Sequence, residues 1–256
     1  MFSEERKEKI LEVVNRKKTV KVSELSELLK TSEVTIRRDL DELHNEQKLY
    51  RTHGGAMVMR HEKKELPWYE LRVRQIEEKQ KIARAAFKYI CDNDVILMDD
   101  STTVQELAKL VAEADFEDLT VVTVSIPVVN ILLTNKKLNV VIIGGQITRC
   151  TNAVLGSMAE HMLKDMRVDK CFIGINGIEP EGIYTTSNFL EMTTKRAMME
   201  VSRQKFILAD HTKFGQPSFL KVEEMAGRVD CLITDKRLDD FNYSIIEKTT
   251  NVEFAQ

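Results

Sequence analysis

The chain has 256 residues, of which 43% are hydrophobic and 31% are charged, and its net charge is −3 at pH 7. This composition is that of an ordinary soluble globular protein, and the length allows one large domain and one small one. No apolar run is long enough to cross a membrane, and the charged start of the chain is unlike a signal peptide. We therefore expect a cytoplasmic protein that makes no contact with a membrane.

The cysteines argue against two kinds of site. Cys91, Cys150, Cys171 and Cys231 lie far apart in the sequence, and none belongs to a C-x-x-C pair. The spacing predicts neither a structural zinc site nor a compact disulfide framework. We expect buried free thiols in a reducing cytosol, and we expect no metal and no cofactor.

The first elements are two short helices separated by an extended piece. The helices are expected over Glu4–Lys17 and Ser23–Leu29, and the extended piece over Thr19–Val22. Apolar residues recur along both helices at helical spacing. Those expected to face a core are Ile10, Leu11, Val13, Val14, Leu25, Leu28 and Leu29.

A third helix begins at Ser32, a residue whose hydroxyl can cap the first turn. The apolar residues Ile36, Leu40 and Leu43 follow at helical spacing, which predicts one buried face. The opposite face carries Thr35, Arg37 and Arg38 close to the helix start. A tight turn at Lys30–Thr31 joins this helix to the one before it, which is the layout of a helix-turn-helix that presents the second helix to the DNA major groove.

A small β-wing is predicted after the third helix. Residues alternate along Leu49–Met57, and the run contains Arg51, His53 and the glycine pair that starts at Gly54. The extended piece before the second helix can pair with this wing. We expect Ser32, Thr35, Arg37, Arg38, Arg51, His53 and Gly54 to contact DNA.

Charge is distributed unevenly, in a way that suits a DNA-binding head. Residues 1–60 have a net charge of +2 and the rest of the chain has −5. A charge of +2 is a weak attraction for phosphate, so local placement of cations and more than one head per assembly would be needed. On pattern alone an alternative stays open, because two amphipathic helices are common in helical domains and paired arginines usually face solvent.

The chain divides after the wing. Residues 59–66 are charged and lack apolar periodicity, so we assign 1–58 to the head, 59–66 to a linker and 67–256 to a second domain. The second domain is expected to begin with one long helix over Tyr69–Tyr89. That helix could mediate self-association or simply pack against the domain.

From Asp94 onward, short apolar strands alternate with helices. This alternation predicts a largely parallel sheet that is covered by helices on both faces. The expected strands are Val95–Met98, Leu119–Val124, Leu138–Ile143, Lys170–Ile175, Lys205–Ala209 and Cys231–Thr234, the last of the chain. The expected helices run to Ala114 and over Ile126–Leu133, Ser157–Met166 and Glu191–Ser202.

Polar residues collect where these strands end, which is where open α/β sheets bind ligands. Asp99–Thr103 follows a strand and opens a helix, so its hydroxyls and backbone N–H groups can hold a phosphate. The chain has no G-x-x-x-x-G-K loop, which argues against nucleotide triphosphate hydrolysis. The alternative is a simple turn with a helix cap, and lone lysines are mostly solvated. Gly144 and Gly145 allow the backbone to approach a ligand closely. Arg149, Lys195 and Lys213 are cations able to pair with phosphate.

The segments ERKEKILEVV, VKVSELSELLKTSEVTIRRDLDELHNEQKLYRTHGGA and LADHTKFG resemble the DeoR family of bacterial transcriptional regulators. The resemblance covers almost the whole chain. It implies an N-terminal winged helix-turn-helix and a C-terminal α/β sensor domain similar in fold to ribose-5-phosphate isomerase. It also implies a phosphorylated sugar as the effector.

The same resemblance selects effector residues by motif. The family's D-x-[GS]-T-T loop matches Asp99–Thr103, and its Gly-Gly turn matches Gly144 and Gly145. Its D-x-x-K-F-G run matches the segment that contains Lys213. The full set is Asp99, Ser101, Thr102, Thr103, Gly144, Gly145, Arg149, Asn176, Glu191, Lys195 and Lys213. Asn176 stands where the related isomerases have an aspartate. An amide cannot act as a general base, which argues for binding rather than turnover.

The sequence thus predicts a repressor of sugar metabolism genes that binds operator DNA as a homo-oligomer and is not an enzyme. The first rival is a sugar-phosphate isomerase-like enzyme with a DNA-binding head. The second is an interaction module whose helix-turn-helix contacts protein.

Overall fold

The computed structural model describes residues 3–17, 19–45, 48–52, 54–58, 68–223 and 228–256. The chain forms two compact units, Met1–Lys64 and Glu65–Gln256. The predicted linker, residues 59–66, lies outside the described residues.

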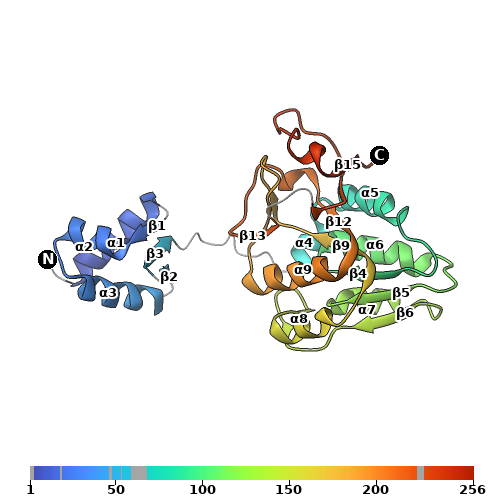
Figure 1. The fold of residues 1–256 in the computed structure, drawn as a ribbon, viewed down its shortest axis with the longest axis horizontal. Helices are drawn as coiled ribbons and strands as arrows, with labels where there is room; N and C mark the ends of the chain where they lie inside the picture. The colour runs from blue at the N-terminus through green and yellow to red at the C-terminus, as the bar shows by residue number, and fades with distance from the viewer. Residues whose placement is uncertain (1–2, 18, 46–47, 53, 59–67, 224–227) are drawn as a thin grey trace. The chain divides into compact units, whose positions relative to one another are not determined.

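The first unit is a winged helix-turn-helix. Its helices are α1 (Ser3–Lys17), α2 (Val22–Leu29) and α3 (Glu33–Asn45), and its strands are β1 (Thr19–Lys21), β2 (Leu49–Thr52) and β3 (Gly55–Val58). The strands form an antiparallel sheet in the order β1-β3-β2, with Val20 opposite Ala56. The extended piece therefore pairs with the wing, as the sequence predicts (Figure 1).

The core of this unit differs from the sequence prediction in α2. Leu25 is fully buried and Leu29 partly buried, but Leu28 is 53% exposed, so its predicted burial is wrong. Val22 and Leu25 make the buried face of α2, and Leu28 lies beyond the edge of that face. The remaining core residues are Ile10, Val13, Val14, Val20, Ile36, Leu40, Leu43, Leu49 and Ala56.

The second unit is built on a seven-stranded sheet in the order β15-β14-β12-β9-β4-β5-β6. Every pair of neighbours in it is parallel, which confirms the predicted sheet type. The strands are β4 (Val95–Met98), β5 (Thr120–Thr123), β6 (Asn139–Ile142), β9 (Val168–Gly174), β12 (Ser202–Leu208), β14 (Cys231–Thr234) and β15 (Asn251–Phe254).

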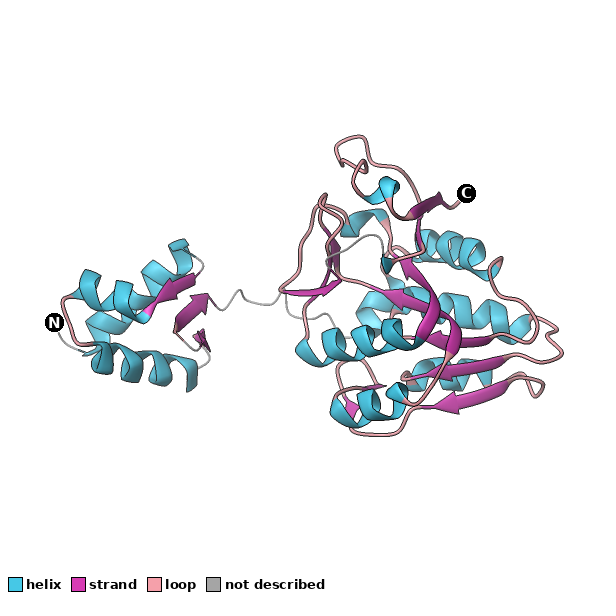
Figure 2. Cartoon of the chain, in the orientation of Figure 1, coloured by secondary structure: helices cyan, strands magenta, loops and turns pink. Residues whose placement is uncertain are grey.

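Helices cover both faces of this sheet (Figure 2). One face packs against α5 (Ile76–Phe87), α6 (Thr102–Glu113) and α7 (Ile126–Leu132), and the other against α8 (Ser157–Lys164) and α9 (Phe189–Val201). Alternate strand residues enter opposite cores, because side chains alternate along a strand. Within β4, Leu97 belongs to one core and Ile96 and Met98 to the other.

Short elements that the sequence analysis did not predict surround the main sheet. Strands β7 (Ile147–Thr148) and β8 (Ala153–Val154) form a hairpin. A three-stranded antiparallel sheet contains β10 (Gly177–Ile178), β11 (Tyr184–Thr186) and β13 (Leu220–Glu223). The described residues also include the 3-10 helices η1 (His211–Lys213) and η3 (Ile246–Lys248).

Three expectations about the second unit need correction. The predicted long helix Tyr69–Tyr89 is two helices, α4 (Trp68–Val73) and α5, because Gln75 adopts a left-handed conformation with φ of 49°. Cys231–Thr234 is not the last strand, since β15 follows it and pairs with it in parallel. Cys91 is exposed and Cys150 partly exposed, so only two of the four free thiols are buried.

The break between α4 and α5 costs the helix a backbone hydrogen bond, and a side chain replaces it. In a continuous helix the carbonyl of Leu71 would accept the N–H of Gln75. Here Lys79 Nζ, from the buried side of α5, donates to that carbonyl at 2.5 Å. No helix in the described part of the chain combines the length and apolarity that a membrane span requires.

Candidate functional site

Helix α3 begins with the predicted cap. The hydroxyl of Ser32 accepts the N–H of Thr35 at 3.3 Å, and the two hydroxyls lie 2.9 Å apart. Both predicted arginines point to solvent. Arg37 is 57% exposed and Arg38 is 82% exposed.

Each of these arginines pairs with an acid on its own helix. Arg37 contacts Glu33 at 3.0 Å and Arg38 contacts Glu42 at 3.2 Å, both at i,i+4 spacing. Exposed pairs of this kind contribute about 0.3–0.5 kcal/mol, which a DNA phosphate or base can replace. The pairing therefore holds the side chains over the helix surface without preventing contact with DNA.

A partly buried ion pair that sequence reasoning missed fixes α3 on α1. Arg6 binds both carboxylate oxygens of Asp39, with Nε 2.5 Å from Oδ2 and Nη2 2.9 Å from Oδ1. Asp39 is 3% exposed. The signal was an aspartate one residue before the buried Leu40, but nothing in the spacing identified its partner.

The wing turns tightly beside β1. A Cβ on Gly55 would lie 1.9 Å from the carbonyl oxygen of Val20, so only glycine fits there. Gly54 is exposed, and a Cβ on it would meet nothing within 4 Å. Arg51 lies on β2, but its side chain and all of His53 lie outside the described residues. Their predicted DNA contacts remain predictions.

In the second unit, the loop after β4 is held together by Asp99. Its Oδ1 accepts the N–H of Ser101 at 2.9 Å, and its Oδ2 accepts the N–H of Gly174 at 2.8 Å. A Cβ on Gly174 would lie 2.3 Å from Ser101 Cβ, which explains the glycine at the end of β9. The two strand ends that the topology makes neighbours therefore meet at this carboxylate.

Lys195 completes this cluster from α9. Its Nζ lies 2.5 Å from Asp99 Oδ2 and 3.6 Å from Asp100 Oδ1, and all three side chains are at least 95% buried. Burial lowers the pKa of Lys195, but the charges of Asp99, Asp100 and Glu191 outweigh burial and raise the pKa above its ordinary value. Burial also raises the pKa of Asp100. Lys195, predicted as an anion contact, is thus paired with carboxylates.

The start of α6 has two unused backbone donors. The Ser101 hydroxyl accepts the N–H of Val104 at 3.3 Å, and the Ser101 carbonyl accepts the N–H of Gln105 at 3.0 Å. The first four N–H groups of a helix lack partners within the helix. In the part of the chain that the structure describes, those of Thr102 and Thr103 have no other acceptor. They are free to bind an anion.

A second polar group joins Asn176 to Glu191. The hydroxyl of Thr186 lies 2.7 Å from Glu191 Oε2 and 3.0 Å from Asn176 Oδ1, and its proton can be donated to one of them at a time. Glu191 is 7% exposed and sits in the first turn of α9, which Asn188 caps. Its charge contributes to the raised pKa of Lys195, so this group adjoins the Asp99 cluster.

Other predicted effector residues lie apart from these contacts. Gly144 and Gly145 face α8, where added Cβ atoms would lie 3.5 Å from Met162 Sδ and 3.3 Å from Met158 Cβ. Gly145 has φ of 143°, which favours glycine. Arg149 is exposed in the turn between β7 and β8. No described contact joins any of these three to the Asp99 loop.

Lys213, on η1, has a neighbour that the sequence analysis missed. Lys79 is 5% exposed, and burial lowers its pKa to about 8. The charge of Asp210 opposes this shift and that of Lys213 adds to it. The available signal was a lysine at helical spacing with Ile82, Ala83 and Ala86, on the buried face of α5.

One group of side chains has the chemistry of a metal site. Glu78, His211 and Asp235 each offer a ligand atom, all within 4.8 Å of one another. Asp235 already accepts the backbone N–H of His211 at 2.7 Å and lies 2.7 Å from His211 Nδ1. This aspartate therefore serves as the structural partner of the histidine.

Family models match both units. A model described as the DeoR-like helix-turn-helix domain matches residues 6–62, and one described as the DeoR C terminal sensor domain matches residues 74–236. The second match alone covers more than half of the chain.

Relatives match along most of their length. An HTH-type transcriptional regulator of Bacillus subtilis, YulB, is 34% identical over 247 residues, which are 96% of this chain and 94% of that protein. A lactose phosphotransferase system repressor of Staphylococcus aureus is 37% identical over 86% of this chain and 87% of its own. Its namesake in Staphylococcus epidermidis is 34% identical, with coverages of 90% and 91%.

Solved structures overlap only in part. A D-ribose-5-phosphate isomerase in complex with phospho-erythronic acid is 17% identical, with a TM-score of 0.42 over 54% of each chain. A translation initiation factor eIF-2B of Pyrococcus horikoshii is 18% identical, with a TM-score of 0.41 over 59% of this chain and 52% of its own. The chain thus spans about half the length of these structures, and such overlap does not identify a shared site.

Proposed function

The chain belongs to the DeoR family of transcriptional regulators, and we propose that it represses sugar metabolism genes under the control of a phosphorylated sugar. Operator DNA is bound by the first unit and the effector by the second. These two roles are inferred from the family, and the residues proposed for each role are inferred from the contacts within each unit.

The DNA interface uses the start of α3 and the wing. Thr35, Arg37 and Arg38 lie on the solvent side of α3, opposite the buried Ile36, Leu40 and Leu43. This orientation is what docking in the major groove requires, because base edges are read by the exposed N-terminal residues of the second helix. Arg51, His53 and Gly54 extend the contact from the wing.

The start of α6 carries the effector proposal. The free N–H groups of Thr102 and Thr103 point out of a twelve-residue helix, whose dipole favours an anion at this end. The hydroxyl and the carbonyl of Ser101 accept the N–H groups of Val104 and Gln105, so the loop is already ordered for binding. We assign these two donors to the phosphate group of the effector.

Further cations are available to that phosphate. Lys213 is partly exposed, and Lys79 is a buried amine whose charged form is disfavoured by burial. With a pKa of about 8, Lys79 still carries its proton at pH 7 and can pair with a phosphate as a cation. Asn176 and Glu191 are assigned to the sugar hydroxyls, and Arg149 to the phosphate as a further cation.

The hydrogen bond of Lys79 to α4 offers a way for the effector to control DNA binding by the first unit. Lys79 donates to Leu71 in α4, and α4 begins directly after the linker. An effector that draws Lys79 toward its phosphate weakens this tie to α4. The effector changes operator affinity only if it binds one arrangement of α4 more tightly than another.

The rival isomerase activity is not favoured. Asn176 offers an amide where a carboxylate base is required, and Glu191 is already hydrogen bonded to Thr186. We infer that the second unit binds its ligand without turnover. A net charge of only +2 attracts DNA phosphates weakly, so we infer that at least two heads bind the operator together. Binding takes place in the cytoplasm, where the chromosome lies.

The test is a thermal unfolding titration of the full chain with pentose and hexose phosphates, with the parent sugars as controls. A ligand that binds only the folded state raises the unfolding temperature. The matched variants are Thr102→Pro and Ser157→Pro, each at the first residue of a helix, where proline is tolerated. Ser101 has the extended conformation that a following proline prefers.

Thr102→Pro deletes one of the two free N–H groups. It should weaken phosphosugar binding roughly tenfold or more, since a hydrogen bond to a charged group contributes about 1.5–3 kcal/mol. Ser157→Pro should leave binding unchanged. A stabilisation that is the same in both variants, or none with any phosphosugar, would refute the proposed effector site.

A further inference from the structure

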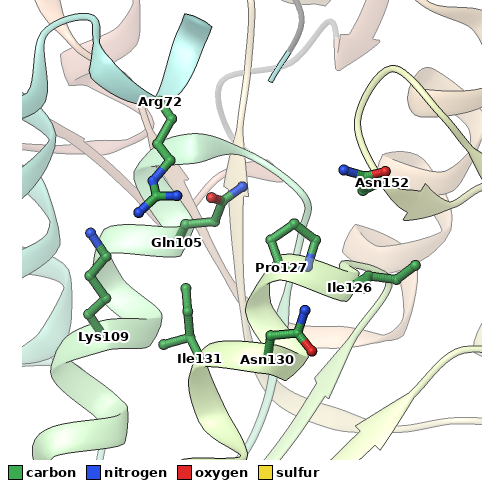
Figure 3. A pocket seen from close by; sticks show the side chains of 8 residues that line it. All are labelled: Arg72, Gln105, Lys109, Ile126, Pro127, Asn130, Ile131 and Asn152. Atoms are coloured by element: carbon green, nitrogen blue, oxygen red, sulfur yellow. The ribbon is translucent and has the colours of Figure 1, made fainter. Parts of the chain in front are cut away.

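A cavity of about 260 Å³ lies between α4, α6 and α7 (Figure 3). None of the residues predicted to bind DNA or the effector lines it. Its volume is somewhat below the roughly 300–1,000 Å³ of pockets for drug-sized ligands, so it suits a small metabolite.

One side of the cavity is cationic. Arg72 reaches it from α4 and Lys109 from α6, and Figure 3 shows both side chains on the same side. Lys109 pairs with Glu106 at 2.5 Å. Within the described ranges, no carboxylate pairs with Arg72. Among the residues that the structure describes, one positive charge at the cavity therefore has no counterion.

The other side is apolar, with amides at its edge. Ile126, Pro127 and Ile131 of α7 form the apolar wall. Asn130 and Asn152 add side-chain amides to the lining. An apolar wall facing a guanidinium is complementary to a molecule with an apolar part and an anionic end.

We propose that this cavity binds a small molecule with an apolar body and one phosphate or carboxylate group. The anion lies against Arg72 and Lys109, and the body lies against the apolar wall of α7. This cavity is separate from the proposed effector site, and the proposal for it does not depend on the effector proposal.

Its place in the fold gives such a ligand a route to the other sites. Gln105, which also lines the cavity, donates from Nε2 to the carbonyl of Asp100 at 3.4 Å. An occupant thus contacts both α4 and α6, and the start of α6 is the proposed effector site. If it alters effector affinity, the effector must alter its affinity by the same factor.

The experiment is calorimetric titration of the full chain with phenyl phosphate and with benzoate, compared with inorganic phosphate. At least one of the two aromatic anions should bind at least tenfold more tightly than inorganic phosphate. Arg72→Ala should weaken that binding about tenfold, in line with the loss of a charge-assisted hydrogen bond. Arg84→Ala, an exposed arginine of α5 outside the cavity, should change nothing.

Two further variants separate this cavity from the effector site. Asn130→Trp places a large side chain in the cavity and should abolish binding of the aromatic anion. Lys213→Ala should leave it intact, although it weakens any phosphosugar bound at the effector site. The proposal is overturned if neither anion binds, or if binding survives both Arg72→Ala and Asn130→Trp in variants that keep the wild-type unfolding temperature.

Discussion

Removing the amine of Lys195 should destabilise the second unit strongly, and more at pH 7 than at pH 5. Lys195→Met leaves Asp99 and Asp100 buried beside each other without a cation. Breaking a buried ion pair from one side costs about 3–5 kcal/mol. One carboxyl can escape this cost by binding a proton, which sets a ceiling on the penalty.

The ceiling follows from the ordinary pKa of an aspartate, 3.8. Holding such a carboxyl protonated at pH 7 costs about 4 kcal/mol, because each pH unit above the pKa costs about 1.4 kcal/mol. At pH 5 the same proton costs less than about 2 kcal/mol. The gap in stability between wild type and Lys195→Met should therefore shrink by roughly 2–3 kcal/mol from pH 7 to pH 5.

The two aspartates should respond differently. Asp99→Asn removes the negative charge beside Lys195 and replaces one acceptor oxygen with an NH2 donor. The bonds from Ser101 N–H, Gly174 N–H and Lys195 Nζ can then not all form, so the substitution should cost about 1.5–3 kcal/mol. Asp100→Asn should cost less than about 1 kcal/mol, because burial raises the pKa of Asp100 and its ionised form is already disfavoured.

Urea unfolding followed by tryptophan fluorescence measures these changes, because the single tryptophan, Trp68, belongs to the second unit. Lys164→Met, at an exposed lysine of α8, is the control and should stay within about 0.5 kcal/mol of wild type. A penalty below 1 kcal/mol for Lys195→Met, or one equal at pH 5 and pH 7, would refute this reasoning.

Three other predictions concern separate sites. Gly174→Ala should destabilise the second unit by about 1–3 kcal/mol in urea, because its methyl group would lie 2.3 Å from Ser101 Cβ; an unchanged midpoint would contradict this. Lys79 binds its proton less tightly when folded, with a pKa of about 8 against 10.5, so this group makes stability rise with pH between those values. Lys79→Met should remove about 1–3 kcal/mol of that rise, and an identical pH profile in both proteins would count against it. Arg38→Ala should weaken operator binding and lower the salt slope by about 1 in fluorescence anisotropy titrations, with Arg84→Ala as the control that leaves both unchanged.

The sequence was informative where a pattern is local. Ser32 caps α3 because a hydroxyl at that position bonds the N–H three residues later, a contact that spacing alone predicts. The parallel sheet follows from apolar strands that alternate with helices, and its order required the structure. Strand β15 escaped prediction because irregular chain and a 3-10 helix, rather than a full helix, connect it to β14.

Long-range pairings could not be predicted. Lys195 lies 96 residues from Asp99, and nothing local distinguishes it from a solvated lysine. Lys79 likewise depends on a left-handed Gln75 that breaks a pattern suited to one continuous helix. Both lysines acquire their charge environment only when distant strand ends and helices meet at one edge of the sheet.

The central claim is that a phosphorylated sugar at the start of α6 controls DNA binding by the first unit. Its most direct test is anisotropy titration of a labelled operator fragment, selected from genomic DNA, with and without the phosphosugar that stabilises the chain. We predict at least a tenfold change in operator Kd for wild type and for Ser157→Pro. Thr102→Pro should keep its operator affinity in the absence of the sugar and lose that response. An operator affinity that no phosphosugar changes, or a full response in Thr102→Pro, would contradict the account.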